Sequence, residues 1–276
     1  MKRTTTPQAE VATLFIAASE HDSNLYYARR FMAPDPFIYL EIKGERLMVM
    51  SDLEMDRART QASVDRVLSY SEIEQKAKKQ GIKDPTAVDI VHVVLKESKI
   101  RRLSVPANFP VIHAARLQER GYSLKPKRDP FYEQRVVKTA EEVRHIEDAQ
   151  RATEEAVAAA HALLRRAEIK DEQLWLDGEV VTSERIKKFV TAKLMERVCI
   201  AQPTTVAGGE QACDPHNVGS GPLPAHRSII FDVFPRSATS RYFADMSRTV
   251  IRGKVSQEVK RLYGAVKDAQ EDAIDK

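Results

Sequence analysis

The sequence predicts an α/β (α+β) protein with two domains, on three observations. The 276 residues are enough for about two domains at roughly 150 residues each. Up to about residue 130, short apolar runs such as "FIYLEI" alternate with amphipathic segments such as "TAVDIVHVVLKES", as in a layered α/β domain. The stretch "SLKPKRDPFYEQRVVK" carries two prolines and a charge cluster, as a connector does. We therefore place one domain at residues 1–130 and a second at residues 131–276.

In the first domain we expect a mixed β-sheet covered by helices. The apolar run from Val11 to Ala18 reads as a strand. Gly44, between "YLEIK" and "ERLMVM", marks a hairpin turn, whereas Gly81 and Gly121 lie where helices should end. Histidines 92 and 113 fall on apolar helical faces and are interpreted as core residues rather than ligands.

The second domain is expected to open with two helices. Thr139 and Glu142 have the S/T-x-x-E spacing of a capping box, so a long helix should begin at about residue 140. A second helix should begin after Thr182 or Ser183, with Glu184 favourable in its first turn. The final segment, "SQEVKRLYGAVKDAQEDAI", has the apolar stripe of an amphipathic helix.

Composition argues against several classes of protein. Lys and Arg number 44 against 40 Asp and Glu, without a long basic run interleaved with aromatics, so a nucleic-acid partner is not expected. The early apolar run gives way at once to Ser19 and Glu20, which fits neither a signal peptide nor a membrane span. Only two cysteines are present, without metal-site spacing, and the expected location is the reducing cytoplasm.

The stretch "FDVFPRSATSRYFADMSRTV" places two aspartates in runs that otherwise read as apolar strands. Pro235 to Arg241 supplies turn chemistry, which predicts a hairpin. Centred on residues 238 and 239, this hairpin would place Asp232 directly opposite Asp245, on a face that Ile230 and Phe234 would make buried.

Two opposed carboxylates on a buried face repel each other and require a positive partner. One or two divalent metal ions would meet this need, and paired metals are a known hydrolytic arrangement. The alternative is that each aspartate forms a salt bridge with a nearby arginine, since Arg236, Arg241 and Arg248 are close in sequence.

Several segments in order resemble the pita-bread metallopeptidases of the creatinase, prolidase and Xaa-Pro aminopeptidase group. They are "NLYYARRF", "RVVKTAEEVRHIEDAQRATEEAV", "TSERIKKFV", "DPHNVGSGPL" and "IIFDVFPRSATSRYFADMSRTVIRG". The resemblance implies a creatinase-type N-terminal domain followed by a pita-bread catalytic domain. Asp232 and Asp245 then correspond to two metal ligands, and His216 to the histidine that contacts the substrate outside the metal shell.

The sequence departs from the family pattern at its C-terminal end. In the family, a further histidine and two glutamates complete the dinuclear site from later strands, and no counterparts follow Asp245 here. The expectation is therefore an N-terminal domain and the first part of a catalytic domain, inactive by itself.

The resemblance implies a metal-dependent peptidase that cleaves between an N-terminal residue and proline. It implies two divalent ions, with manganese favoured over cobalt, zinc or iron by oxygen-rich ligation. The expected substrate is a peptide or dipeptide with proline at the second position. The chain is also expected to form a homodimer, and no membrane partner is expected. Two alternatives stay open: a metal-free creatinase-like enzyme, which the paired aspartates disfavour, and a non-catalytic binding protein that lacks the full metal centre.

Overall fold

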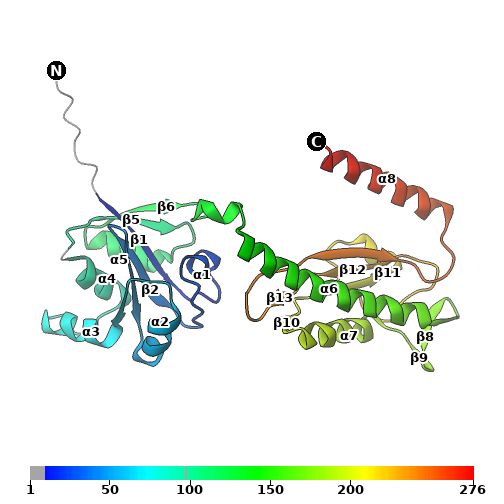
Figure 1. Cartoon of the computed structure of the whole chain (residues 1–276), viewed down its shortest axis with the longest axis horizontal. Coiled ribbons are helices and arrows are strands. Elements are labelled where there is room, and N and C mark those ends of the chain that lie inside the picture. Colours follow the sequence, from blue (N-terminus) through cyan, green and yellow to red (C-terminus); the bar gives the residue numbers. More distant parts are fainter. Residues whose placement is uncertain (1–9, 97) are drawn as a thin grey trace, which may run out of the picture. The chain divides into compact units, whose positions relative to one another are not determined.

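The computed structural model describes residues 10–96 and 98–276 (Figure 1). The chain divides into two compact units, of which the first ends at Val137 and the second begins at Lys138. Phe131 is 5% exposed and packs edge-on against Phe15 at 4.8 Å between ring centroids, so the proline-rich segment belongs to the core of the first unit.

The first unit is built on a six-stranded sheet of order β4-β3-β2-β1-β5-β6. Its strands are β1 (Val11–Ala17), β2 (Phe37–Ile42), β3 (Glu45–Met50), β4 (Arg66–Ser69), β5 (Arg102–Pro106) and β6 (Ser123–Lys127). The pairs β1–β2 and β2–β3 are antiparallel and the other three pairs are parallel, which confirms the mixed sheet. The predicted strand at Val11 is also confirmed.

Helices cover both faces of this sheet. They are α1 (Ser23–Arg29), α2 (Met55–Gln61), α3 (Tyr70–Lys79), α4 (Ala87–Lys96) and α5 (Val111–Glu119), with short 3-10 turns η1 (Asp52–Glu54) and η2 (Glu133–Val136). Because side chains alternate along a strand, Leu14 joins the core under α3, α4 and α5, whereas Phe15 joins the core on the side of α1 and α2. Central strands are therefore apolar at almost every position.

The predicted glycine positions follow from backbone geometry. Lys43 and Gly44 have φ angles of 54° and 85° and form the two-residue turn between β2 and β3. Gly81 and Gly121, at φ angles of 89° and 80°, follow the last residues of α3 and α5. This left-handed conformation is the usual way to end a helix.

The second unit contains three long helices and three small sheets. Its elements are α6 (Ala140–Arg166), β7 (Glu168–Lys170), β8 (Gln173–Leu176), β9 (Glu179–Val180), α7 (Ser183–Glu196), β10 (Cys199–Ile200), β11 (Thr205–Gly208), η3 (Gly209–Cys213), β12 (Ile229–Val233), β13 (Arg236–Ser237), β14 (Met246–Val250) and α8 (Gln257–Ile274). The sheets have the orders β7-β8-β9, β10-β13 and β11-β12-β14. Within the described residues, no helix is long and apolar enough to cross a membrane.

Both predicted helix starts in this unit are confirmed. The Thr139 hydroxyl accepts a 3.2 Å hydrogen bond from the amide of Glu142, and the Glu142 carboxylate accepts one of 2.8 Å from the amide of Thr139. The hydroxyl of Thr182 caps α7 by accepting from the amide of Arg185 at 3.2 Å. The expectation that two helices open the domain is wrong in one respect, because the β7-β8-β9 meander lies between them.

Candidate functional site

Asp232 lies on the three-stranded sheet β11-β12-β14, in which both pairs of strands are antiparallel, and Asp245 lies next to the first residue of β14. Helices α6 and α7 pack on one face of this sheet, where Ile229, Phe231 and Val233 are fully buried. Figure 1 shows α6 running along the strands. The opposite face carries the alternate residues of β12, and Asp232 is one of them.

Asp232 lies at the centre of this open face. It is paired with Thr205 of β11 and with Ser247 of β14. The Ser247 hydroxyl donates a 2.9 Å hydrogen bond to Oδ1 of Asp232. The neighbour on β14 therefore orients the carboxylate, and Oδ2 has no hydrogen-bond partner within residues 10–96 and 98–276.

Asp245 immediately precedes β14 and is exposed. The antiparallel pattern continues past the end of the strand, because the amide of Ala244 donates to the carbonyl of Pro235 at 3.1 Å. Asp245 is two residues from Ser247, so strand alternation places it on the same face as Asp232. This backbone agrees with the prediction that the two aspartates point to the same side of the hairpin.

The predicted register, however, is wrong by two residues. Asp232 faces Ser247, and Asp245 is its diagonal neighbour rather than its direct partner. The reason is the loop: Ser237 donates to the carbonyl of Tyr242 at 2.9 Å, which leaves four loop residues centred on Thr239 and Ser240. Arg241 closes this loop in a left-handed conformation at φ 69°. Hairpin register is set by loop length and turn type.

The expected burial of this face is also wrong. Ile230, Asp232 and Phe234 are each half-buried, and Phe243 is 51% exposed. Both faces of β12 carry apolar side chains, and α6 and α7 cover the face opposite to the one that carries Asp232. Two carboxylates on an open face repel each other less strongly than buried ones, because water screens them.

His216 lies in the loop between η3 and β12 and is exposed. Its backbone amide donates to the Asp214 carboxylate at 3.0 Å, and Gly219 holds the end of the same turn against Val206 of β11. No hydrogen bond or ion pair of the described residues joins the His216 side chain to either aspartate. Its place beside them stays a prediction.

The carboxylates of Asp232 and Asp245 could supply part of the coordination shell of a metal ion. Diagonal neighbours on adjacent strands are roughly 7 to 8 Å apart between Cα atoms, so cations placed between them could contact both carboxylates. Oxygen ligands of this kind suit manganese and other hard divalent ions. Among the described residues, no group of three or more His, Cys, Asp or Glu side chains could hold a metal ion. The two carboxylates alone therefore form an incomplete shell.

Two polar contacts near the site were missed from the sequence. Ser247 is the residue that hydrogen-bonds Asp232, and the register error concealed it. Tyr242, between the hairpin loop and β14, donates a hydrogen bond to Glu142 of α6. No local signal predicts this pairing across 100 residues.

Residues 144–276 match metallopeptidase family M24. No curated protein sequence matches the chain. Among solved structures, the X-Pro aminopeptidase from Thermotoga maritima is similar with a TM-score of 0.74 at 18% identity, over 95% of this chain and 68% of that one. The prolidase from Pyrococcus horikoshii has a TM-score of 0.72 at 18% identity, over 96% and 67%. The Xaa-Pro dipeptidase from Bacillus anthracis has a TM-score of 0.75 at 16% identity, over 94% and 65%. The chain thus has the fold of these proteins and spans about two thirds of their length.

Proposed function

Because residues 144–276 match metallopeptidase family M24, we propose that the chain carries part of the metal site of a peptidase that cleaves between an N-terminal residue and proline. The observation that carries this proposal is the placement of Asp232 and Asp245 on one face of the β12–β14 hairpin. Similarity of fold to an X-Pro aminopeptidase and a prolidase supports the preference for proline. We extend the proposal to a homodimeric cytoplasmic enzyme acting on peptides or dipeptides.

The side chains present have distinct roles in this proposal. Divalent ions, with manganese favoured, would polarise the scissile carbonyl and lower the pKa of a water molecule. Asp232 and Asp245 would hold these ions, and the hydroxyl of Ser247 would keep Asp232 in a fixed rotamer. His216 would donate a hydrogen bond to the substrate as negative charge develops on its carbonyl oxygen. Further ligands would have to come from outside the described residues.

A second candidate function is non-catalytic peptide or protein binding. The observation that favours it is that no group of three metal-ligating side chains occurs in residues 10–96 and 98–276. A protein that keeps the fold without a complete metal centre would need neither Asp232 nor Asp245. The two functions therefore differ in whether these carboxylates bind a metal ion.

Paramagnetic broadening by manganese distinguishes the two functions. Titration of the isotope-labelled chain with Mn²⁺ should broaden the amide signals of Asp232, Asp245 and Ser247 before those of residues far from this face. Asp232→Asn should abolish this effect, whereas Asp272→Asn, a matched change on the exposed part of α8, should preserve it. Broadening that is absent from β12, or that survives Asp232→Asn, would overturn the peptidase proposal.

A further inference from the structure

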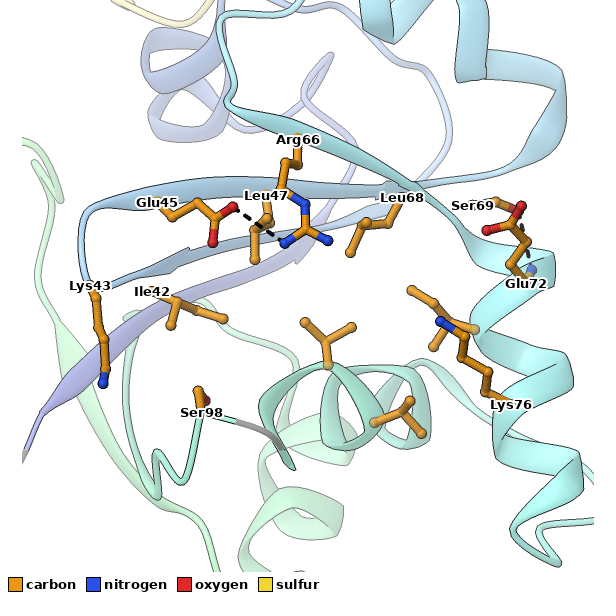
Figure 2. A pocket seen from close by; sticks show the side chains of 13 residues that line it. Ile42, Lys43, Glu45, Leu47, Arg66, Leu68, Ser69, Glu72, Lys76 and Ser98 are labelled. Carbon is orange, nitrogen blue, oxygen red and sulfur yellow. Dashed lines mark hydrogen bonds and ion pairs between the residues drawn. The ribbon is translucent and has the colours of Figure 1, made fainter.

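The first unit contains a cavity of about 590 Å³ between the edge of its sheet and helices α3 and α4 (Figure 2). Its floor is apolar and comes from three strands and two helices. The apolar lining residues are Ile42, Leu47, Leu68, Ile73, Val93 and Val94. Ligand sites in proteins typically have volumes of roughly 300 to 1,000 Å³ and an apolar lining with a few polar groups. The cavity has the size of such a site, and polar or charged side chains border its apolar floor, namely those of Lys43, Glu45, Arg66, Ser69, Glu72, Lys76 and Ser98.

The register of the sheet explains the composition of this cavity. Leu47 pairs with Arg66, and Val49 pairs with Leu68, so Leu47, Arg66 and Leu68 all point to the same face. Strand β4 is the edge of the sheet, and its residues Arg66 and Leu68 are exposed and half-buried, respectively. One side of the cavity therefore has a cation directly beside an apolar floor.

Two cationic side chains reach into the cavity from different elements. Figure 2 shows Arg66 extending from β4 and Lys76 extending from α3 toward the same space. Arg66 uses one nitrogen, Nη1, for an ion pair of 3.3 Å with Glu45, which leaves its other donors available. Within the part of the chain that the structure describes, Lys76 forms no ion pair. An anion between Arg66 and Lys76 would gain a partner on each side.

The remaining charges at the cavity limit the anion to a single negative charge. Glu45 and Glu72 also line it and would repel a dianion. The third lining cation, Lys43, already pairs with Glu10 at 2.9 Å. One carboxylate complements this balance better than a phosphate dianion, and the apolar floor requires that the rest of the ligand be apolar.

We propose that this cavity binds a small monocarboxylic acid with an apolar body. The carboxylate lies between Arg66 and Lys76, and the apolar chain covers Leu47 and Leu68. The cavity lies wholly within the first unit, so the site stands independently of the proposed peptidase function.

The test uses the full 276-residue chain and octanoate as the probe. Amide chemical shifts should move at Leu47, Leu68 and Val93, and calorimetry should give a saturable isotherm. Lys76→Ala should weaken binding about fivefold, the size expected of one exposed ion pair. Lys78→Ala is the matched control, because Lys78 lies on the same helix, pairs with Glu74 at 3.0 Å and does not line the cavity.

Further measurements test separately the roles of the carboxylate and of the apolar chain of the ligand. 1-Octanol should bind more weakly than octanoate, and octylamine should bind more weakly still, since the cations repel it. Leu68→Trp should abolish binding by filling the cavity while circular dichroism stays unchanged. The proposal is overturned if octanol or octylamine binds as tightly as octanoate, if Lys78→Ala weakens binding as much as Lys76→Ala, or if octanoate still binds to the Leu68→Trp protein.

Discussion

The hydroxyl of Tyr242 donates a 2.6 Å hydrogen bond to Oε1 of Glu142, which joins the β12–β14 loop to the first turn of α6. Glu142 is 3% exposed, and its other carboxylate oxygen accepts from the amide of Thr139. The ring of Tyr242 stacks on His145 with 5.5 Å between centroids. Because Asp245 follows Tyr242 by three residues and immediately precedes β14, this contact fixes the segment that carries Asp245.

Tyr242→Phe should therefore destabilise the second unit by about 1 to 3 kcal/mol, because a buried carboxylate oxygen loses a donor. The measurement is urea unfolding followed by the fluorescence of Trp175, the one tryptophan of the sequence, which lies in β8 of this unit. Tyr263→Phe is the control, since Tyr263 is 66% exposed and should change stability by less than about 0.5 kcal/mol. Equal unfolding midpoints for both variants would contradict the prediction.

Gly219 sets the end of the loop that carries His216. Its φ is 79°, and a Cβ atom there would lie 2.0 Å from the carbonyl oxygen of Val206. Gly221 has a similar φ of 70° but open space around the Cβ position, which makes it a matched control.

We expect Gly221→Ala to cost about 1 to 2 kcal/mol from backbone strain alone. Gly219→Ala should cost clearly more, because the loop must also move away from β11. Urea unfolding followed by Trp175 fluorescence measures both values. The amide signals of His216 and Val206 should shift in the Gly219 variant and stay in place in the Gly221 variant. Equal losses of stability would show that the contact with Val206 has no energetic role.

Local backbone signals were sufficient to predict helix starts and one hairpin. The Thr139 capping box and the turn at Gly44 depend on neighbouring residues only, and both are confirmed. The dipeptide Asp177-Gly178 lies between β8 and β9 with φ angles of 56° and 82°, and this hairpin signal could have revealed the missed meander. The first turn of the meander, Asp171-Glu172 between β7 and β8, lacks a glycine and gives no such signal.

The geometry of the site could not be predicted to the same extent. The register of the β12–β14 hairpin depends on Arg241 adopting a left-handed conformation, which its residue type does not indicate. The buried face of β12 depends on where α6 and α7 pack, because Ile229 and Ile230 are equally apolar. Parity of the two aspartates was predictable, since a shift of two residues leaves the face of every side chain unchanged.

His161 should make the second unit less stable at mildly acidic pH. Its ring packs edge-on against Phe231 at 4.9 Å, and its Nε2 is buried without a hydrogen-bond partner among the described residues. Burial lowers the pKa of His161, and the positive charges of Arg165 and Arg248 lower it further. The unfolded chain therefore takes up a proton below about pH 6.5, while the folded chain does so only at lower pH.

Stability should accordingly fall as the pH drops below about 6.5, by at most about 1.4 kcal/mol per pH unit for one proton. The pKa values of Glu168 and Glu184 are lowered by hydrogen bonds, so these groups lose stabilisation at more acidic pH. Urea midpoints between pH 7 and 5 should be less dependent on pH in His161→Gln than in the natural chain. An unchanged profile in His161→Gln would refute this assignment.

The activity of the 276-residue chain by itself follows from its donor set. Two carboxylates supply part of one coordination shell, and a pair of divalent ions needs more ligands against their mutual repulsion. The described residues provide no larger group of metal-ligating side chains. We therefore expect weak manganese binding and no release of proline from an Xaa-Pro dipeptide or from a longer Xaa-Pro peptide. The assay is proline release with and without added manganese, beside Asp232→Ala. Turnover that requires manganese and disappears in Asp232→Ala would contradict the prediction, because it would show that the missing ligands are unnecessary or come from a second copy of the chain.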